Sequence, residues 1–204
     1  MLDCNKIKIG IINLEINNLY SIYNAFKKIG YKTTIIKKKI NNYDFIVLPG
    51  VGSYREGMNS LKKNNLIDAL KEYVIIKKKN ILGICLGMQM LFSKSNEHGN
   101  TDGLDLISGS VKKFKKKKNF FIPVVGWYKT KSLAQRLNNK YFYHTHSYYC
   151  EPKNKNLVLS NTIYQKFSYC SSVQDKNILA FQFHPEKSGI NGINLLKTIP
   201  SLYK

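Results

Sequence analysis

Long apolar runs are missing from this chain of 204 residues. No segment approaches the ~20 consecutive apolar residues that a membrane-spanning helix needs. The N-terminus, Met-Leu-Asp-Cys-Asn-Lys, also lacks the apolar stretch and small-residue cleavage site of a signal peptide. We therefore expect a cytoplasmic protein with no membrane partner. Apolar residues still make up 43% of the chain, which supports a sizeable core and argues against disorder.

Paired cysteines are missing as well. The four cysteines are widely spaced and form no C-x-x-C pair; they are Cys4, Cys85, Cys150 and Cys170. This spacing predicts neither a disulfide framework nor a structural zinc site. We expect a protein that uses no metal and no cofactor.

Acidic residues and arginine are scarce. Twelve Asp and Glu stand against 33 Lys and Arg, which gives a net charge of +21, and the only arginines are Arg55 and Arg136. Such a charge suggests nucleic-acid binding, but planar, bidentate recognition of phosphate and guanine favours Arg over Lys. Lys, Asn and Ile are abundant and share A/T-rich codons, so genome composition is the simpler explanation. We expect no nucleic-acid partner, and we interpret the lysine-rich run 112–118 as a solvated loop.

The first half of the chain alternates between strand patterns and helix patterns. Short apolar runs predict buried strands at Lys8–Ile12, Thr34–Ile36, Phe45–Leu48 and Ile81–Ile84. Apolar residues at helical spacing predict helices over Leu19–Ile29, Leu66–Val74 and Leu86–Phe92, with Gly30 ending the first of them. This alternation predicts a mostly parallel central sheet flanked by helices on both faces.

The second half of the chain is rich in Tyr, Phe, Val and Ser and has the pattern of strands. The predicted strands are Ile107–Phe114, Phe120–Val125, Tyr141–Tyr149, Leu157–Ser160, Tyr169–Val173 and Ile178–Phe183. A last helix is predicted over Ile190–Ile199, ended by Pro200. Because the chain shows no repeat and no Pro/Gly/Ser-rich linker, we expect a single α/β domain over residues 1–204 with an antiparallel elaboration in its second half.

Cys85 has the surroundings of a catalytic nucleophile. In Gly83-Ile-Cys-Leu-Gly87 it follows an apolar strand and precedes a helical pattern, with glycine two residues away on either side. This is the layout of a nucleophile elbow. A helix N-terminus helps a thiol to ionise, and the backbone N–H of Leu86 can point at a developing oxyanion. Taken alone, the segment also fits a buried cysteine at the end of a strand.

A histidine and a carboxylate occur together near the C-terminus. His184 follows an apolar run and Glu186 lies two residues further on, with Pro185 between them to stiffen the segment. A thiol nucleophile needs a histidine base and, ideally, a carboxylate that fixes the tautomer of that base. The rival bases are His98, His144 and His146.

A glycine-rich turn, Pro49-Gly-Val-Gly52, closes the third predicted strand. Such a turn exposes backbone N–H groups that can hold an anion or an oxyanion. The signal is weak by itself, because many strand-to-helix turns have this composition and no dinucleotide or P-loop signature is present.

Together the three segments resemble the class I (triad-type) glutamine amidotransferases, which carry P-G-x-G, a strand–helix cysteine and H-P-E in this order. Here 33 residues separate Gly52 from Cys85, and 99 separate Cys85 from His184. The finer resemblance, nearly end to end, is to the glutaminase subunits of imidazole glycerol phosphate synthase. It is carried further by Gly126-Trp127, by the segment 146–149, by Gln182-Phe-His-Pro-Glu-Lys-Ser188, and by Met88, where amidotransferases of purine and anthranilate synthesis often carry His.

The resemblance implies a flavodoxin-like class I glutamine amidotransferase fold and the hydrolysis of glutamine to glutamate and ammonia. It implies catalysis by Cys85, His184 and Glu186. The implied oxyanion hole is Leu86 with Gly52 and Val51, and the implied glutamine contacts are Gln89, Glu97, His146, Ser147 and Tyr148. The implied partner is a (β/α)8-barrel cyclase subunit in a heterodimer, which uses the ammonia to form imidazole glycerol phosphate and aminoimidazole carboxamide ribotide in histidine biosynthesis. The residues expected at that interface are Asn18, Trp127 and Lys187.

The chain departs from the family at two turns. Residues 13–18 replace a turn that usually resembles D-Y-G-x-G-N, and residues 123–128 replace P-H-x-G-W-N. These departures leave open a glutaminase that serves an amidation step in surface-sugar biosynthesis. Two other classes are a non-catalytic protein that binds nucleic acid through its lysines and a cysteine peptidase on a related α/β sheet. The intact Cys85, His184 and Glu186 argue against the non-catalytic class.

Overall fold

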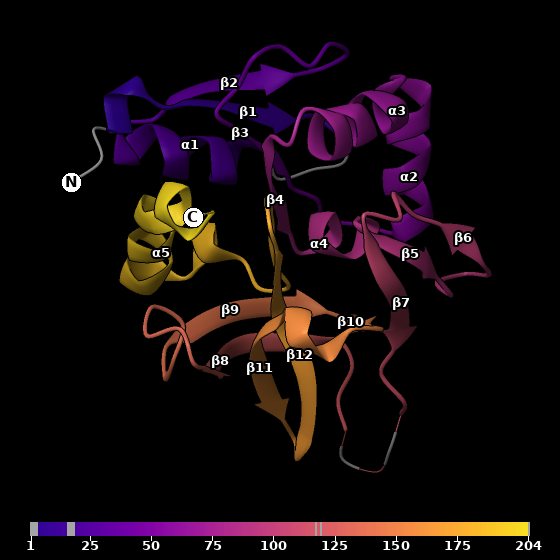
Figure 1. Ribbon diagram of the computed structural model, residues 1–204. Coiled ribbons are helices and arrows are strands. Elements are labelled where there is room, and N and C mark those ends of the chain that lie inside the picture. Colours follow the sequence, from indigo (N-terminus) through magenta and orange to yellow (C-terminus); the bar gives the residue numbers. More distant parts are fainter. Residues whose placement is uncertain (1–3, 16–18, 117, 119, 204) are drawn as a thin grey trace.

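The structure is a computed structural model that describes residues 4–15, 19–116, 118 and 120–203. Five parallel strands form its central sheet, in the order β2 (Lys32–Ile36), β1 (Lys8–Ile12), β3 (Phe45–Leu48), β4 (Asn80–Ile84) and β13 (Ile178–Phe181) (Figure 1). Leu48 pairs with Gly83, and Ile84 pairs with Phe181. The C-terminal ends of β3, β4 and β13 therefore lie at one edge, and all three sequence motifs begin there.

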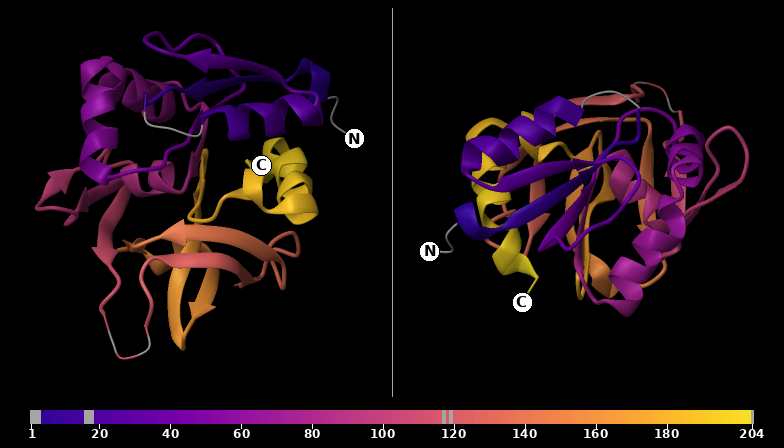
Figure 2. Two further views of the ribbon diagram at one scale, coloured as in Figure 1. Left: turned by 180° about the vertical axis from the view of Figure 1, so that it is seen from behind. Right: turned by 90° about the horizontal axis from the view of Figure 1, so that it is seen from above.

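Helices cover both faces of these strands. Phe45 and Val47 of β3 pack in one core with α1 (Leu19–Ile29) and α5 (Gly189–Leu202). Ile46 and Leu48 point to the opposite face, as the two-residue period of a strand requires, and pack with α2 (Tyr54–Lys63), α3 (Leu66–Lys71) and α4 (Leu86–Met90). A five-residue π-helical segment, Glu72–Ile76, extends α3. Figures 1 and 2 show α1 and α5 side by side, away from α2 and α3.

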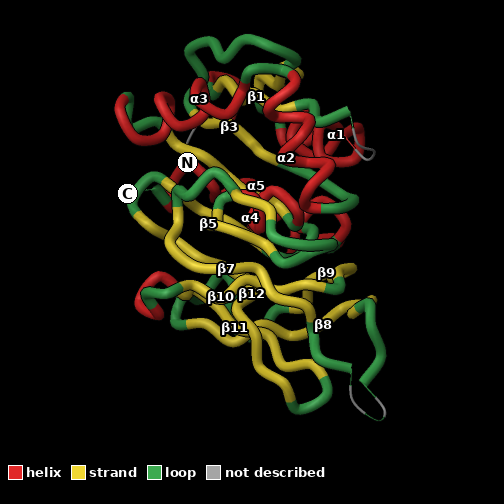
Figure 3. Tube along the Cα trace, turned by 90° about the vertical axis from the view of Figure 1, so that its right-hand side faces the viewer, coloured by secondary structure: helices red, strands yellow, loops and turns green. Residues whose placement is uncertain are grey.

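The remaining strands build the elaboration in the second half. From β13 the sheet continues through β12 (Phe167–Asp175), β10 (Tyr148–Pro152), β7 (Ile107–Lys113), β5 (Phe92–Ser95) and β6 (Thr101–Asp102). A branch adds β11 (Val158–Tyr164), β8 (Val124–Ser132) and β9 (Tyr141–His146). All these pairings are antiparallel except β5 with β7. Figure 3 shows most helices gathered around β1 and β3, and this strand-rich region beyond them.

Short 3-10 segments complete the fold; they are Cys4–Lys6, Lys155–Leu157 and Pro185–Lys187. Within the described part of the chain, no helix is long and apolar enough to cross a membrane.

The predicted strands of the parallel sheet occur, although β2 begins at Lys32 and β13 ends at Phe181 rather than Phe183, and several other predicted bounds were wrong. The helix predicted to reach Phe92 ends at Met90, because Phe92 is already the first residue of β5, where it pairs with Ile107 of β7. The strand predicted over 120–125 begins only at Val124 and continues to residue 132. The strand predicted over 141–149 is two strands, which Ser147 separates.

Helix α2 was not predicted. Few of its residues are apolar at helical spacing, so the sequence feature that best marks this helix is the capping box at its N-terminus. There the Ser53 side chain accepts from the Glu56 N–H, while the Glu56 carboxylate accepts from the Ser53 N–H.

Helix α5 continues through Pro200, where it was predicted to end. Proline has no N–H, so the carbonyl four residues earlier, that of Leu196, loses its helical hydrogen bond. The buried Tyr31 hydroxyl donates to the Leu196 oxygen (3.2 Å) and to the Lys197 oxygen (3.1 Å). Because this tertiary contact satisfies the freed carbonyl, the helix reaches Leu202.

Candidate active site

Cys85 lies in a strained turn between β4 and α4. Its backbone angles are φ 54° and ψ −109°, a conformation that side chains with a Cβ rarely adopt. Its N–H donates to the Phe181 carbonyl of β13 (2.7 Å), which ties the turn to the sheet edge. Gly87 allows α4 to lie directly against β3, because a Cβ there would overlap the Leu48 carbonyl. These contacts give Cys85 the strand–turn–helix geometry of a nucleophile elbow; its role as a nucleophile stays a prediction.

His184 and Glu186 form an ion pair just beyond the end of β13. His184 Nδ1 lies 2.7 Å from Glu186 Oε1, and their side chains are only 2% and 3% exposed. The backbone is fixed on the other side by β9, because the His184 N–H donates to the Tyr143 carbonyl (2.8 Å) and Ser188 links both segments. Since a carboxylate accepts the Nδ1 proton, Nε2 is the nitrogen left to exchange protons with another group.

The charge state of His184 depends on two neighbours. Burial by itself lowers the pKa of this imidazole, but the nearby Cys85 sulfur and the Glu186 carboxylate outweigh burial and raise the pKa to about 10. Nε2 is buried and makes no hydrogen bond of good geometry with the described residues. His184 and Cys85 are therefore close enough to interact electrostatically, and the raised pKa keeps the imidazole protonated at neutral pH.

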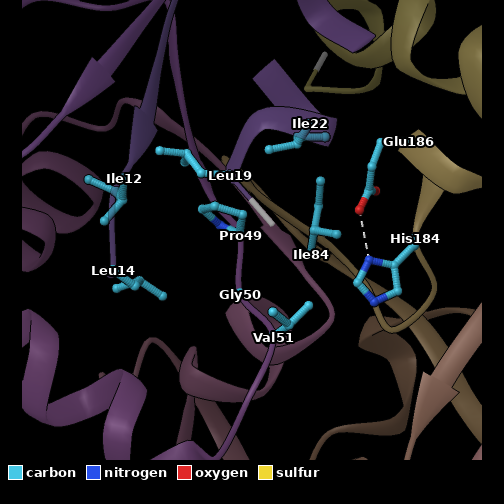
Figure 4. A pocket seen from close by; sticks show the side chains of 10 residues that line it. All are labelled: Ile12, Leu14, Leu19, Ile22, Pro49, Gly50, Val51, Ile84, His184 and Glu186. Atoms are coloured by element: carbon cyan, nitrogen blue, oxygen red, sulfur yellow. Dashed lines mark hydrogen bonds and ion pairs between the residues drawn. The ribbon is translucent and has the colours of Figure 1, made fainter. Parts of the chain in front are cut away.

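Apolar side chains shield this ion pair on its far side. Figure 4 shows His184 and Glu186 at the margin of a narrow pocket whose other walls are apolar. Its free volume is about 10 Å³, near the space that one water molecule needs. Its apolar walls are the side chains of Ile12, Leu14, Leu19, Ile22, Pro49, Val51 and Ile84. The pair is thus largely shielded from bulk solvent, where its mutual attraction would be weaker.

The glycine-rich turn after β3 lies against the start of α4. A Cβ at Gly50 would come within 3.1 Å of the Leu86 side chain, so the turn and the elbow are in contact. Gly52 has a φ of 115°, which an L side chain rarely adopts, and Ser53 then caps α2. The structure thus brings the turn against Leu86, the residue that follows Cys85.

A cleft of about 430 Å³ opens over Cys85. It brings together all eight residues predicted for the oxyanion hole and for glutamine binding. Its lining includes the predicted residues Val51, Gly52, Leu86, Gln89, Glu97, His146, Ser147 and Tyr148, and also His98, Lys113, Pro123 and Thr145, which were not predicted as contacts. The cleft therefore has the polar and charged groups that a small amino-acid substrate needs.

Comparison with known proteins identifies the family. A family model described as glutamine amidotransferase class-I matches residues 11–198. The chain belongs to this family. It is similar to "Imidazole glycerol phosphate synthase subunit HisH 1" of Campylobacter jejuni, with 42% identity over 95% of this chain and 100% of the relative. A second relative, "Imidazole glycerol phosphate synthase subunit HisH" of Carboxydothermus hydrogenoformans, is 41% identical over 93% of this chain and 96% of its own length.

Solved structures show the same fold. One, described as a glutamine amidotransferase, has a TM-score of 0.76 at 15% identity and covers 95% of this chain and 98% of its own. PurLQS from Thermotoga maritima has a TM-score of 0.74 at 16% identity, covering 98% and 100%. The class I glutamine amidotransferase fold predicted from the sequence is confirmed.

The residues predicted to bind glutamine already have partners within the protein. Gln89 does not cap its helix; its amide nitrogen donates to the Tyr148 carbonyl (3.2 Å) and to Gln182 (3.2 Å). Glu97 accepts from the Tyr54 N–H at the start of α2 (2.6 Å). His146 bonds through Nδ1 to the Tyr148 carbonyl (2.7 Å), and burial lowers its pKa to about 4, so it is neutral at pH 7. Their contacts with glutamine stay predictions.

His144 does not line the cleft over Cys85. It lies on β9 and is fully buried, and it is hydrogen-bonded to the Tyr169 hydroxyl (3.0 Å). Burial lowers the pKa of His144 well below the ordinary value. His184 is the histidine that has both a carboxylate and the Cys85 sulfur beside it.

The predicted partner-interface residues are partly placed. Trp127 on β8 is 59% exposed and packs edge-on against Tyr143, whose carbonyl holds the His184 N–H. Lys187 is exposed at the end of the 3-10 segment that carries Glu186. Asn18 lies outside the described residues. Trp127 thus contacts a residue that is hydrogen-bonded to His184, and Lys187 directly follows Glu186 in the chain.

Sequence reasoning missed Gln182. Its side chain is fully buried, and its amide nitrogen lies 3.9 Å from Cys85 Sγ. The available signal was a single polar residue within the otherwise apolar run 178–183. A buried amide in such a run needs hydrogen-bond partners, which indicates a specific polar site nearby.

Proposed function

We propose that this chain is the glutaminase subunit of imidazole glycerol phosphate synthase, which hydrolyses glutamine to glutamate and ammonia. The observation that carries the chemistry is the approach of Cys85, which lines the large cleft, to the buried His184–Glu186 pair, which lines the narrow pocket. The relatives named as subunits of this synthase, 41–42% identical over almost their whole lengths, support the assignment to it.

In the first half of the reaction, the Cys85 thiol gives its proton to His184 Nε2 while Glu186 holds Nδ1–H. The thiolate attacks the side-chain amide carbon of glutamine, and a sulfur–carbon bond forms. The negative oxygen is stabilised by the N–H of Leu86 and by a backbone N–H of the turn 50–52. The imidazolium then protonates the leaving nitrogen, and ammonia departs from a γ-glutamyl thioester.

In the second half, the same imidazole removes a proton from water as the water attacks the thioester. The carbon–sulfur bond breaks, glutamate leaves, and the Cys85 sulfur regains its proton from His184. Each proton that His184 accepts is returned within the cycle. The contact that raises the pKa of His184 to about 10 supports this role, because it favours the imidazolium beside a thiolate.

The relatives named as subunits of the synthase support an ammonia acceptor on a separate subunit. The proposed partner is a (β/α)8-barrel cyclase that forms imidazole glycerol phosphate and aminoimidazole carboxamide ribotide. Exposed Trp127 and Lys187, next to the elements that hold the catalytic pair, support docking on this side.

The test mixes this chain with a cyclase subunit from the same source and measures glutamate release, with and without the ligand of the cyclase. We expect slow release from the free chain and faster release when partner and ligand are both present. Glutamine hydrolysis that the cyclase never stimulates would contradict this partner and favour the surface-sugar alternative. Turnover of peptides but not of glutamine would contradict the amidotransferase reaction itself.

A further inference from the structure

Gln182 lies at the centre of a buried hydrogen-bond network that reaches the nucleophile. It follows the last residue of β13 and is fully buried. Its amide oxygen accepts from Gln89 Nε2 (3.2 Å) and from the Cys150 thiol (4.0 Å), and its amide nitrogen donates to Cys85 Sγ (3.9 Å). The network joins α4, β10 and the β13 end around one sulfur atom.

The orientation of the Gln182 amide follows from its neighbours. The Tyr148 carbonyl can only accept, so the end of Gln89 that faces it must be the NH₂ group. The second hydrogen of that NH₂ group points at Gln182, whose facing end must therefore be the oxygen. The Gln182 NH₂ group is then directed at Cys85.

Cys150 reinforces the same orientation. It is buried, and burial raises its pKa well above the ordinary value, so it remains a neutral thiol. A neutral thiol can donate to the Gln182 oxygen. The amide oxygen thus has two donors beside it, and a reversed amide would place its NH₂ group against both of them.

We propose that Gln182 is a positioning residue that holds the Cys85 sulfur and stabilises its thiolate through the amide N–H. This role rests on the proposed function, in which Cys85 is the nucleophile. A thiolate in a buried site needs donors, because burial disfavours the charged form. Gln182 supplies a neutral donor on the side of the sheet, so it stabilises the anion without adding a group that titrates.

Other titratable groups around Cys85 can also affect its ionisation, so the experiment must distinguish their effects from that of Gln182. His184 lies beside it from the end of β13, and Cys150 is on β10. The cleft also contains charged or titratable side chains from the surrounding segments, namely Glu97, His98, Lys113, His146 and Tyr148. Since substitution of Gln182 leaves all of these residues in the chain, a shift in the ionisation of Cys85 that both Gln182 variants share is attributed to the lost amide N–H.

The experiment measures alkylation of Cys85 by iodoacetamide across pH in the free chain, with peptide mapping to assign the label. Gln182→Met keeps the length of the side chain and removes the donor. We expect the pH midpoint of labelling to rise by about one unit, as for loss of a hydrogen bond to a charged group. Gln182→Glu keeps the acceptor for Gln89 but places no N–H on the sulfur, and its midpoint should rise at least as far.

Gln174→Met is the matched control, because Gln174 is on β12 and its amide donates to the Leu202 carbonyl of α5. Its labelling midpoint should equal that of the wild type. Thermal unfolding identifies which Gln182 variant is folded, and either one suffices. A wild-type midpoint in a folded Gln182 variant would overturn the proposal. If the midpoint shifts but neither the variants nor the wild type hydrolyses glutamine, the proposed function fails, while the stabilisation of the Cys85 thiolate by Gln182 stands.

Discussion

Gly87→Ala tests whether the contact between the elbow and the end of β3 controls catalysis. The added Cβ would overlap the Leu48 carbonyl oxygen and lie 2.6 Å from its carbon, whereas ordinary van der Waals contact begins near 3.4 Å. The contact with the carbon alone requires the start of α4 or the end of β3 to move by about 0.8 Å, and the closer overlap with the oxygen requires a larger movement. Both are backbone, so no side chain can rotate away. A displacement near 1 Å in an active site can cost ~100-fold in rate.

The assay is glutamate release by the Gly87→Ala variant in the presence of the cyclase and its ligand. We expect a loss of about 100-fold in kcat, with a destabilisation of about 1–3 kcal/mol from overpacking. Gly189→Ala is the control, because nothing lies within 4 Å of a Cβ there although its φ is 58°. It should lose about 1 kcal/mol of stability and little activity. A folded Gly87→Ala variant with wild-type kcat would refute the reasoning about this contact.

Further predictions concern the ion pair, the interface and α5. His184→Ala should reduce glutamate release more than Glu186→Gln, because the imidazole moves protons while the carboxylate orients it. Ammonium salt should rescue synthase turnover in both; failure with an intact complex would place their role elsewhere. The pKa of His184, about 10, exceeds its unfolded value. Its stabilising contribution is therefore complete below about pH 6.5 and lost towards pH 10. The free energy of unfolding should fall more steeply over that interval in the wild type than in Glu186→Gln, and equal slopes would contradict this. Lys187→Ala should weaken cyclase binding or stimulation, by ~2–5 kcal/mol if its charge pair is desolvated, and Trp127→Ala should act in the same way. Both should leave the basal rate of the free chain nearly unchanged, and wild-type binding with full stimulation would exclude a coupling role. Tyr31→Phe should lower the free energy of unfolding by about 1–2 kcal/mol, because it leaves α5 carbonyl groups without a donor; an unchanged denaturation midpoint would contradict this.

Most of the parallel sheet could be predicted because four of its five strands are short apolar runs, whereas the edge strand β2 begins Lys-Thr-Thr and is only partly buried. β1 and β3 were predicted with their observed bounds, since burial on both faces leaves a continuous apolar signal. The antiparallel half was harder. The break at Ser147 lies within a continuous aromatic pattern, and the passage of α5 through Pro200 depends on Tyr31, which is distant in the sequence. Local pattern cannot reveal a tertiary hydrogen bond.

In the candidate site, too, some residues could be predicted from local sequence and one could not. Cys85, His184 and Glu186 lie in short motifs whose local chemistry is visible in the sequence, and the structure brings them together. Gln182 could not be assigned a role from the sequence. Its contact with Cys85 requires the end of β13 to lie beside the elbow, and its orientation requires Gln89 from α4. Such a role arises only when several elements converge.

The central claim is that Cys85 forms a covalent γ-glutamyl thioester during glutamine hydrolysis. The most direct measurement is acid quenching of the complex during turnover, followed by mass spectrometry of the cysteine-containing peptides. We expect the added mass of a glutamyl group on the peptide that contains Cys85 and on none of the peptides that contain Cys4, Cys150 or Cys170. In Cys85→Ser, both this added mass and the release of glutamate should be lost. Glutamate release by Cys85→Ser within about tenfold of the wild-type rate, well short of the loss expected without a thiolate nucleophile, would contradict the account.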